Sequence, residues 1–364
     1  MTTNRECLAT DPIKLELLNQ GVAEVKDLRS DEELRVLRFE LQTFVCKGQY
    51  AKGLERILSC FNGHIGQVQP ASWVSGFYGS GKSHLVKMLR ALWGDLPFSD
   101  GQRPRGVASL NAEVADALTE LNTQAKRHGG LFAVAGTLSS QSQEGSSVQA
   151  SIRLAIIAVV FRGCGLPEDV HLARFVLRLR AEGHFESVKK YVEERERIWL
   201  DELADLYVSP VIAEALHLKA GLGHSAKEVS GLIKATYAER SDISNSEMVE
   251  LLTKAITGHM GLSGDKFPLT LIALDEVQQF IGKNDDRALG VQEVVEELRK
   301  AQNGRILVVA TGQSAITDTP HLMKLAGRFP PMARVELTDQ DVDTVVRTVL
   351  LAKKPTAMPD VECI

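Results

Sequence analysis

The chain has little that would draw it to a membrane or to nucleic acid. Its 364 residues carry a formal net charge of -5, so no overall positive field attracts nucleic acid or an anionic membrane surface. The longest apolar run, Leu154 to Phe161, is far too short to span a bilayer. The first residues lack the basic start and apolar core of a secretion signal. We therefore expect a cytoplasmic protein without membrane contact, which meets DNA only indirectly or through regions outside this chain.

Cysteine is scarce and shows no pattern. The cysteines are odd in number and have no CxxC or Cys/His spacing; they are Cys7, Cys46, Cys60, Cys164 and Cys363. This distribution favours structural thiols over a zinc site or a catalytic nucleophile. With 44% apolar and 24% charged residues, disorder, collagen and coiled coil are excluded as dominant descriptions.

A phosphate-binding loop is the clearest motif. An apolar strand over 71–75 precedes it and an amphipathic helix follows it; the motif reads Gly76-Phe77-Tyr78-Gly79-Ser80-Gly81-Lys82-Ser83. Glycines let backbone N–H groups turn toward phosphate oxygens, and the helix N-terminus adds its dipole. We expect Lys82 to reach the β- and γ-phosphates and Ser83 to bind Mg²⁺. A merely glycine-rich turn is disfavoured, because every fixed motif position and both flanking elements agree. His84, the next residue, either touches the nucleotide or lies on the surface.

The apolar pattern predicts an α/β fold interrupted by helices. Apolar runs at 131–137, 269–274, 305–311 and 333–337 alternate with helical stripes, which predicts a parallel sheet with helices on both sides. Residues 165–265 show helical stripes, charge runs and capping signals without a strand pattern. We therefore expect a large all-helical insertion there.

An acidic pair follows a buried strand downstream of the loop. Asp275 and Glu276 come directly after the run 269–274. Open α/β sheets bind ligands at the carboxyl ends of their strands, so the pair can share a crevice with Lys82. We expect Asp275 to hold Mg²⁺ and Glu276 to orient and deprotonate the attacking water. A solvated acidic pair at a strand end is the less favoured alternative.

Other polar residues are candidates for contacts with the transferred phosphate. Thr311 or Gln313, at the end of the 305–311 strand, is expected to bond the γ-phosphate or the attacking water, with a simple strand-end turn as the alternative. Arg328, just before the last strand, is the candidate arginine finger, with Arg334 as the fallback and a surface arginine as the alternative. A weaker candidate for a phosphate-contacting face is the arginine group Arg174, Arg178 and Arg180.

Two segments around the loop resemble a known family. They are Leu37-Arg38-Phe39-Glu40-Leu41 through Phe44-Val45-Cys46-Lys47-Gly48-Gln49-Tyr50, and Trp73 through His84. They resemble the large P-loop ATPases of bacteriophage-exclusion (BREX) systems, the BrxC/PglY type, within the origin-recognition/STAND-like group of the AAA+ superfamily. A strand at 131–137 between the loop strand and the acidic strand, with the glutamate directly after the aspartate, resembles the additional-strand, catalytic-glutamate branch of P-loop NTPases.

This resemblance implies an AAA+-like P-loop NTPase fold with ATP and Mg²⁺ as cofactors. It also implies that the segment before the first strand wraps the adenine, so Phe44, Val45 and Tyr50 are expected near the base. The alternative is a helix–helix loop that packs its own aromatic residues. Family members are several times longer, so the chain is expected to be an N-terminal fragment. Its expected parts are an irregular segment 1–30, the ATPase domain in two pieces, 31–164 and 266–337, the insertion 165–265, and a truncated lid 338–364.

The resemblance points to an ATPase that acts as motor or switch in an anti-phage defence complex. Family members act with a DNA methyltransferase and other subunits to mark host DNA and stop phage replication, so the expected partners are other defence-system subunits, and a homo-oligomer is a candidate assembly. A nucleotide-gated scaffold with little or no turnover is the alternative. A DNA-binding module is disfavoured by the acidic balance.

Overall fold

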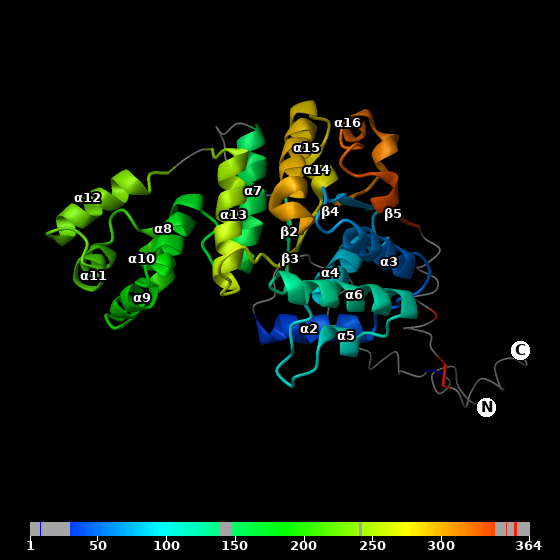
Figure 1. The fold of residues 1–364 in the computed structure, drawn as a ribbon, viewed down its shortest axis with the longest axis horizontal. Coiled ribbons are helices and arrows are strands. Elements are labelled where there is room, and N and C mark those ends of the chain that lie inside the picture. Colours follow the sequence, from blue (N-terminus) through cyan, green and yellow to red (C-terminus); the bar gives the residue numbers. More distant parts are fainter. Residues whose placement is uncertain are drawn as a thin grey trace, which may run out of the picture. The chain divides into compact units, whose positions relative to one another are not determined.

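The computed structural model describes residues 8, 30–138, 148–239, 242–338, 347, 353 and 354. The chain divides into two compact units, Met1–Ser139 together with Leu269–Ile364, and Ser140–Pro268 (Figure 1). The sequence predicts that the helical insertion begins at residue 165, whereas the second unit begins at Ser140. The difference arises because α7 (Val148–Gly163) packs against α13 (Asn245–His259) within this unit. The helix expected to begin at Thr338 lies outside the described residues.

The first unit is built on a five-stranded sheet. Its strands are β1 (Ser72–Gly76), β2 (Leu131–Thr137), β3 (Leu269–Asp275), β4 (Ile306–Gly312) and β5 (Arg334–Leu337). They lie in the order β2-β3-β4-β1-β5, and every neighbouring pair is parallel. The expected α/β fold with a parallel sheet flanked by helices is therefore confirmed.

In the sheet, the strand that lies between β1 and β3 is β4, and not β2, the strand over 131–137. The strand over 131–137 lies between them along the chain, but in the sheet β2 is an edge strand that pairs only with β3. It is β4 that pairs with β1 on one side and β3 on the other. Sequence order alone could not give this spatial order, because parallel strands are joined by crossovers of variable destination.

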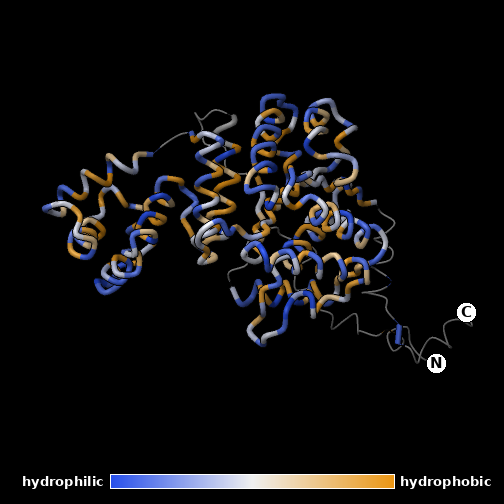
Figure 2. Tube along the Cα trace, in the orientation of Figure 1, coloured by the Kyte–Doolittle hydropathy of each residue, from blue (hydrophilic) through white to orange (hydrophobic). Residues whose placement is uncertain are grey.

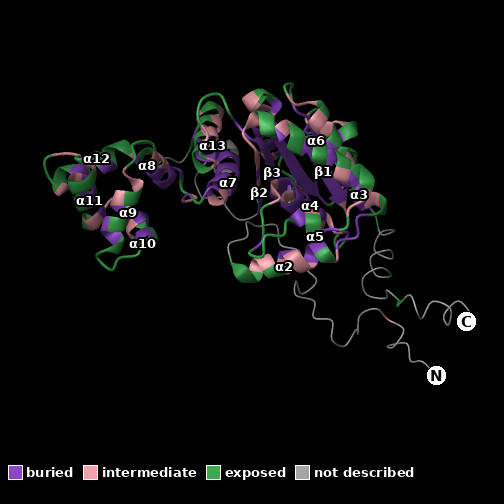
Figure 3. Cartoon of the chain, turned by 60° about the horizontal axis from the view of Figure 1, so that its bottom comes forward, coloured by how far each residue is buried: buried purple, intermediate pink, exposed green. Residues whose placement is uncertain are grey.

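Both faces of the central strands are buried, which explains their continuous apolar sequences. Leu271 of β3 belongs to the hydrophobic core on one face of the sheet, together with residues of α2 (Asp31–Gln42), α3 (Gly48–Gly63) and α4 (Lys82–Gly94). Ile272, the next residue, points to the opposite face, on which α14 (Val277–Ile281) and α15 (Asp285–Lys300) contact β4. Every residue of β3 and β4 is buried, and Figure 3 shows the same for the strands at the centre of this unit.

The helices of the first unit follow their local signals. They are α2 (Asp31–Gln42), α3 (Gly48–Gly63), α4 (Lys82–Gly94), α5 (Pro104–Val107), α6 (Ala112–His128), α14 (Val277–Ile281), α15 (Asp285–Lys300) and α16 (Pro320–Met323). Short 3-10 turns are η1 (Ala301–Gly304), η2 (Ile316–Asp318) and η3 (Pro331–Ala333). Ser30 and Glu33 form a reciprocal capping box at the start of α2. The segment 44–50 is only partly the expected loop, because α3 already begins at Gly48 and carries Tyr50 in its first turn.

In its described residues, 148–239 and 242–268, the second unit consists of helices joined by turns and loops. Besides α7 and α13 it contains α8 (Val170–Ala181), α9 (Phe185–Glu193), α10 (Trp199–Ala204), α11 (Pro210–Ala220) and α12 (Ala226–Thr236). Hydrophobic and hydrophilic residues alternate along them in Figure 2. Ser225 and Ser244 each accept the N–H of the third helical residue, so each serine caps the N-terminus of its helix. In the described part of the chain, no helix has the length and apolarity needed to cross a bilayer.

Candidate active site

The phosphate-binding loop joins the end of β1 to the start of α4. Gly79 and Gly81 have φ of 84° and 85°, a left-handed conformation that glycine adopts at little cost. α4 begins at Lys82, and its first N–H groups lack intrahelical acceptors. The Ser80 side chain is 1% exposed, and its hydroxyl has no hydrogen-bond partner among the described residues. The loop thus presents N–H groups and one buried, unpartnered hydroxyl.

Lys82 forms hydrogen bonds with the backbone of its own loop. Its Nζ donates to the carbonyl oxygens of Gly76 at 2.7 Å and Phe77 at 2.8 Å. Burial lowers the pKa of the Lys82 ammonium, and the negative charge of Asp275 acts in the opposite direction. Lys82 is therefore within electrostatic reach of the acidic pair.

The strand register places the loop and the acidic pair at one edge of the sheet. Ser75 of β1 is level with Gly312 of β4, and Leu274 of β3 is level with Ala310. Asp275, the last residue of β3, is 6% exposed. Adjacent strands lie about 4.8 Å apart, so the ends of β1 and β3 are about 10 Å apart across β4.

Thr311 of β4 organises the acidic pair. Its hydroxyl donates to Asp275 Oδ1, and its oxygen accepts the Glu276 N–H at 2.9 Å. The Glu276 N–H also lies 3.1 Å from Asp275 Oδ1. Glu276 has φ of 58° and ψ of 28°, a left-handed conformation that costs a non-glycine residue about 1–3 kcal/mol and that clusters at active sites. Glu276 is half-buried.

The loop after β4 is held by hydrogen bonds from β1 and from α14. The Ser314 carbonyl accepts a hydrogen bond from Trp73 Nε1 at 3.1 Å. The Ser314 N–H donates to Gln278 Oε1 at 2.8 Å, and Gln278 Nε2 approaches Ser314 Oγ at 3.3 Å. Gln313, the residue before Ser314, is exposed. Its side chain makes no hydrogen bond within the described residues, so it is free to meet a ligand.

The segment expected near the adenine lies beside the loop, with its side chains mostly covered. The Phe44 ring is 5.6 Å from the His84 ring and 6.3 Å from the Tyr50 ring. The Tyr50 hydroxyl donates to the Ser80 carbonyl at 2.7 Å. Phe44, Val45 and Tyr50 are all buried, which favours the alternative that these side chains pack among themselves. His84 is half-buried, not a surface residue, and burial lowers the pKa of its imidazole.

The candidate arginine fingers lie away from this edge. The Arg328 carbonyl accepts the Ala71 N–H at 3.1 Å, one residue before β1 begins, so its backbone is about 16 Å from the loop along the strand. Arg328 Nε is 2.6 Å from Glu296 Oε2 on α15. Arg334 donates to the Phe329 carbonyl at 2.7 Å and braces the turn before β5. The structure therefore does not bring either arginine to the phosphate loop of its own chain.

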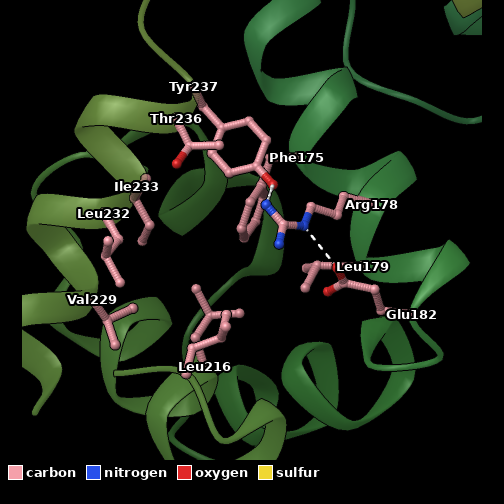
Figure 4. A pocket seen from close by; sticks show the side chains of 11 residues that line it. Phe175, Arg178, Leu179, Glu182, Leu216, Val229, Leu232, Ile233, Thr236 and Tyr237 are labelled. Carbon is pink, nitrogen blue, oxygen red and sulfur yellow. Dashed lines mark hydrogen bonds and ion pairs between the residues drawn. The ribbon is translucent and has the colours of Figure 1, made fainter. Parts of the chain in front are cut away.

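The arginines of the second unit are engaged with protein groups. Arg174 lies 3.1 Å from Glu247, and Arg178 bonds Glu182 at 2.7 Å and the Tyr237 hydroxyl at 3.4 Å. Arg178 lines a cavity of about 150 Å³, whose walls are mainly aliphatic side chains (Figure 4). Arg174 and Arg178 are thus paired with glutamates, and Arg180 donates to the Gly165 carbonyl at 3.4 Å.

The donor set fits a nucleotide with Mg²⁺ better than a protein-only metal centre. No group of three or more His, Cys, Asp or Glu side chains is arranged for a metal within the described ranges. Mg²⁺ needs only one or two carboxylates when substrate phosphates supply the other ligands, and Asp275 and Ser83 are the predicted ligands. Burial raises the pKa of the Cys46 and Cys60 thiols, which disfavours a thiolate nucleophile. No protein-family model matches the chain.

Sequence reasoning missed three supporting residues. Tyr50 was expected at the base, and its hydrogen bond to the loop has no local sequence signal. Trp73 and Gln278 reach the same residue, Ser314, from positions 241 and 36 residues away in sequence. Nothing in the run Val277–Ile281 distinguishes Gln278 from its exposed neighbour Gln279.

Proposed function

We propose that the chain is an ATP-binding and ATP-hydrolysing P-loop ATPase of the AAA+ type. The observation that carries this proposal is the shared sheet edge, where the loop ending in Lys82 faces Asp275 and Glu276. Phosphoryl transfer depends on positioning and charge neutralisation more than on covalent chemistry. A lysine, a buried aspartate and a half-buried glutamate at one edge supply both.

Each residue of the proposed site has a role that follows from its chemistry. Lys82 exchanges its two loop carbonyls for phosphate oxygens, an exchange of neutral for anionic acceptors that strengthens each hydrogen bond. Ser83 and Asp275 hold Mg²⁺, which neutralises phosphate charge when bound. Glu276 accepts the proton of the attacking water, and Thr311 fixes the geometry of the acidic pair. Gln313 is the candidate contact to the γ-phosphate.

The strand order supports the AAA+ type, since β4 lies between the loop strand and the acidic strand and Glu276 directly follows Asp275. The assignment to a BREX defence complex, as motor or switch subunit, rests on the sequence resemblance over about residues 36–93. Under this proposal its partners are other defence-system subunits.

ATP turnover tests the proposal directly. We expect Lys82→Ala to weaken ATP binding, whereas Glu276→Gln keeps binding and lowers turnover by about 10²- to 10⁴-fold, the usual contribution of a general base. Glu293→Gln, an exposed glutamate on α15, and Lys52→Ala, an exposed lysine on α3, are the matched controls. Wild-type turnover in Glu276→Gln contradicts the assigned base, and ATP binding unchanged in Lys82→Ala contradicts the nucleotide site.

A nucleotide-gated scaffold with little turnover is the second candidate. It is favoured by the ion pair between Arg328 and Glu296, because the candidate finger is then occupied within its own chain. Tight ATP binding by the wild type, with turnover no faster than that of Glu276→Gln, would select this candidate.

A further inference from the structure

The Tyr50 hydroxyl forms a hydrogen bond with the backbone of the loop at Ser80. Tyr50 lies in the first turn of α3 and is 7% exposed, and its hydroxyl donates to the Ser80 carbonyl at 2.7 Å. The Ser80–Gly81 peptide immediately precedes Lys82. A trans peptide is planar, and its C=O and N–H point in opposite directions. A carbonyl held toward α3 therefore directs the Gly81 N–H away from α3.

The packing around Gly81 makes this contact specific. A Cβ atom at Gly81 would lie 1.9 Å from the Tyr50 hydroxyl oxygen, so the hydroxyl occupies the space that any side chain at position 81 would need. The φ of 85° at Gly81 also requires glycine. The Tyr50 ring is held edge-on to Phe44 at 6.3 Å, so its own position is fixed by core packing.

We propose that the Tyr50 hydroxyl is a positioning group for phosphate binding, which sets the Ser80–Gly81 peptide so that the Gly81 N–H faces the phosphates. This inference rests on the proposed function, because it assigns a role within the same nucleotide site. It gives Tyr50 a role different from contact with the adenine. The aromatic ring contributes packing, and the hydroxyl contributes orientation of the loop.

Tyr50→Phe separates these two contributions, because it keeps the ring and removes only the donor. Tyr207→Phe is the matched control, since the Tyr207 hydroxyl also donates to a backbone carbonyl, that of Tyr237, in the second unit. Titration calorimetry measures the Kd of the wild type and both variants for ATP with Mg²⁺ and for adenosine. Urea unfolding verifies that both variants are folded at the temperature of the titration.

We expect Tyr50→Phe to raise the Kd for ATP about fivefold to tenfold, the equivalent of one hydrogen bond, and to leave the Kd for adenosine within about twofold. Tyr207→Phe should change neither. An ATP Kd that Tyr50→Phe leaves unchanged overturns the positioning role alone. Equal losses for ATP and adenosine also overturn it, because they indicate a base contact or general loosening. A wild-type protein that binds no ATP overturns the proposed function, and the role of Tyr50 with it.

Discussion

The Thr311 hydroxyl donates a hydrogen bond to the Asp275 carboxylate across the ends of two neighbouring strands. The same oxygen accepts the Glu276 N–H at 2.9 Å, so a single side chain contacts both members of the acidic pair. Thr311 was one of two candidates for contact with the γ-phosphate. Its hydrogen-bonding capacity is used within the protein, which favours Gln313 for that contact and gives Thr311 a supporting role.

Replacing Thr311 by valine should damage the acidic pair without changing side-chain shape. The Glu276 N–H and Asp275 Oδ1 each lose one hydrogen bond and keep only the bond that they make with each other, at a cost of about 1–3 kcal/mol in the free energy of unfolding. We expect ATP turnover to fall about tenfold or more. Thr311→Ser retains the hydroxyl and should retain most of the activity. Urea unfolding and steady-state turnover measure both effects, and wild-type turnover in the valine variant would refute the supporting role.

The clamp on Ser314 predicts a difference between two adjacent glutamines. Gln278→Ala removes two contacts to Ser314 and frees the loop that carries Gln313, so turnover should fall severalfold while the Kd for ATP changes little. Gln279 is exposed, and Gln279→Ala should behave as wild type. A double variant with Gln313→Ala adds a further test. If Gln278 acts through Gln313, the two losses are not additive, and full additivity would contradict the clamp.

The lowered pKa of Lys82 predicts a pH dependence of ATP binding. An exposed lysine loses its proton near the ordinary pKa value of about 10.4, and a buried lysine loses its proton at a lower pH. A neutral amine does not attract phosphate, so the affinity should decline as the pH rises through the alkaline range toward that ordinary value. In Lys82→Arg the guanidinium stays charged, so its affinity, although weaker, should stay constant. Calorimetry across this range checks both profiles, and parallel profiles would remove Lys82 as the titrating group.

The strands could be predicted from the sequence because their information is local. A parallel strand buried on both faces is a continuous apolar run, and the predicted run 131–137 matches β2, while 269–274 and 305–311 differ from β3 and β4 by one residue. The phosphate loop is equally local, since its motif and flanking elements are contiguous.

Spatial relationships between distant segments could not be predicted in this way. The place of β4 beside β1, the packing of α7 on α13 and the reach of Tyr50 to Ser80 each join parts of the chain far apart in sequence. Each depends on which surfaces meet after folding, and a single sequence does not contain a local signal for that. The roles assigned to Lys82, Asp275 and Glu276 stay predictions that kinetics must test.

The ion pair between Arg328 and Glu296 allows a test of whether Arg328 acts on the nucleotide of a neighbouring subunit. Lys300, with Arg328 and Arg299, keeps the pKa of the Glu296 carboxyl below its ordinary value, so Glu296 is charged at neutral pH and holds Arg328. An arginine finger acting on a neighbouring chain must leave this partner. Glu296→Gln weakens the pair, and it should therefore raise turnover in an oligomer if release of Arg328 limits the rate. Lower turnover in Glu296→Gln would indicate that the ion pair supports the active form.

Mixing two inactive variants separates action in trans from action within one chain. Arg328→Ala lacks the finger, which contributes about 10³- to 10⁵-fold in other phosphoryl-transfer systems, and Glu276→Gln lacks the base. In a mixed oligomer some interfaces combine an intact Glu276 with an Arg328 donated by the neighbour, so part of the activity should return. Every chain in the mixture carries one of the two substitutions, so a site that takes both residues from one chain cannot recover. Absence of recovery, in an assembly shown by labelled subunits to exchange, would leave Arg328 as a structural partner of Glu296.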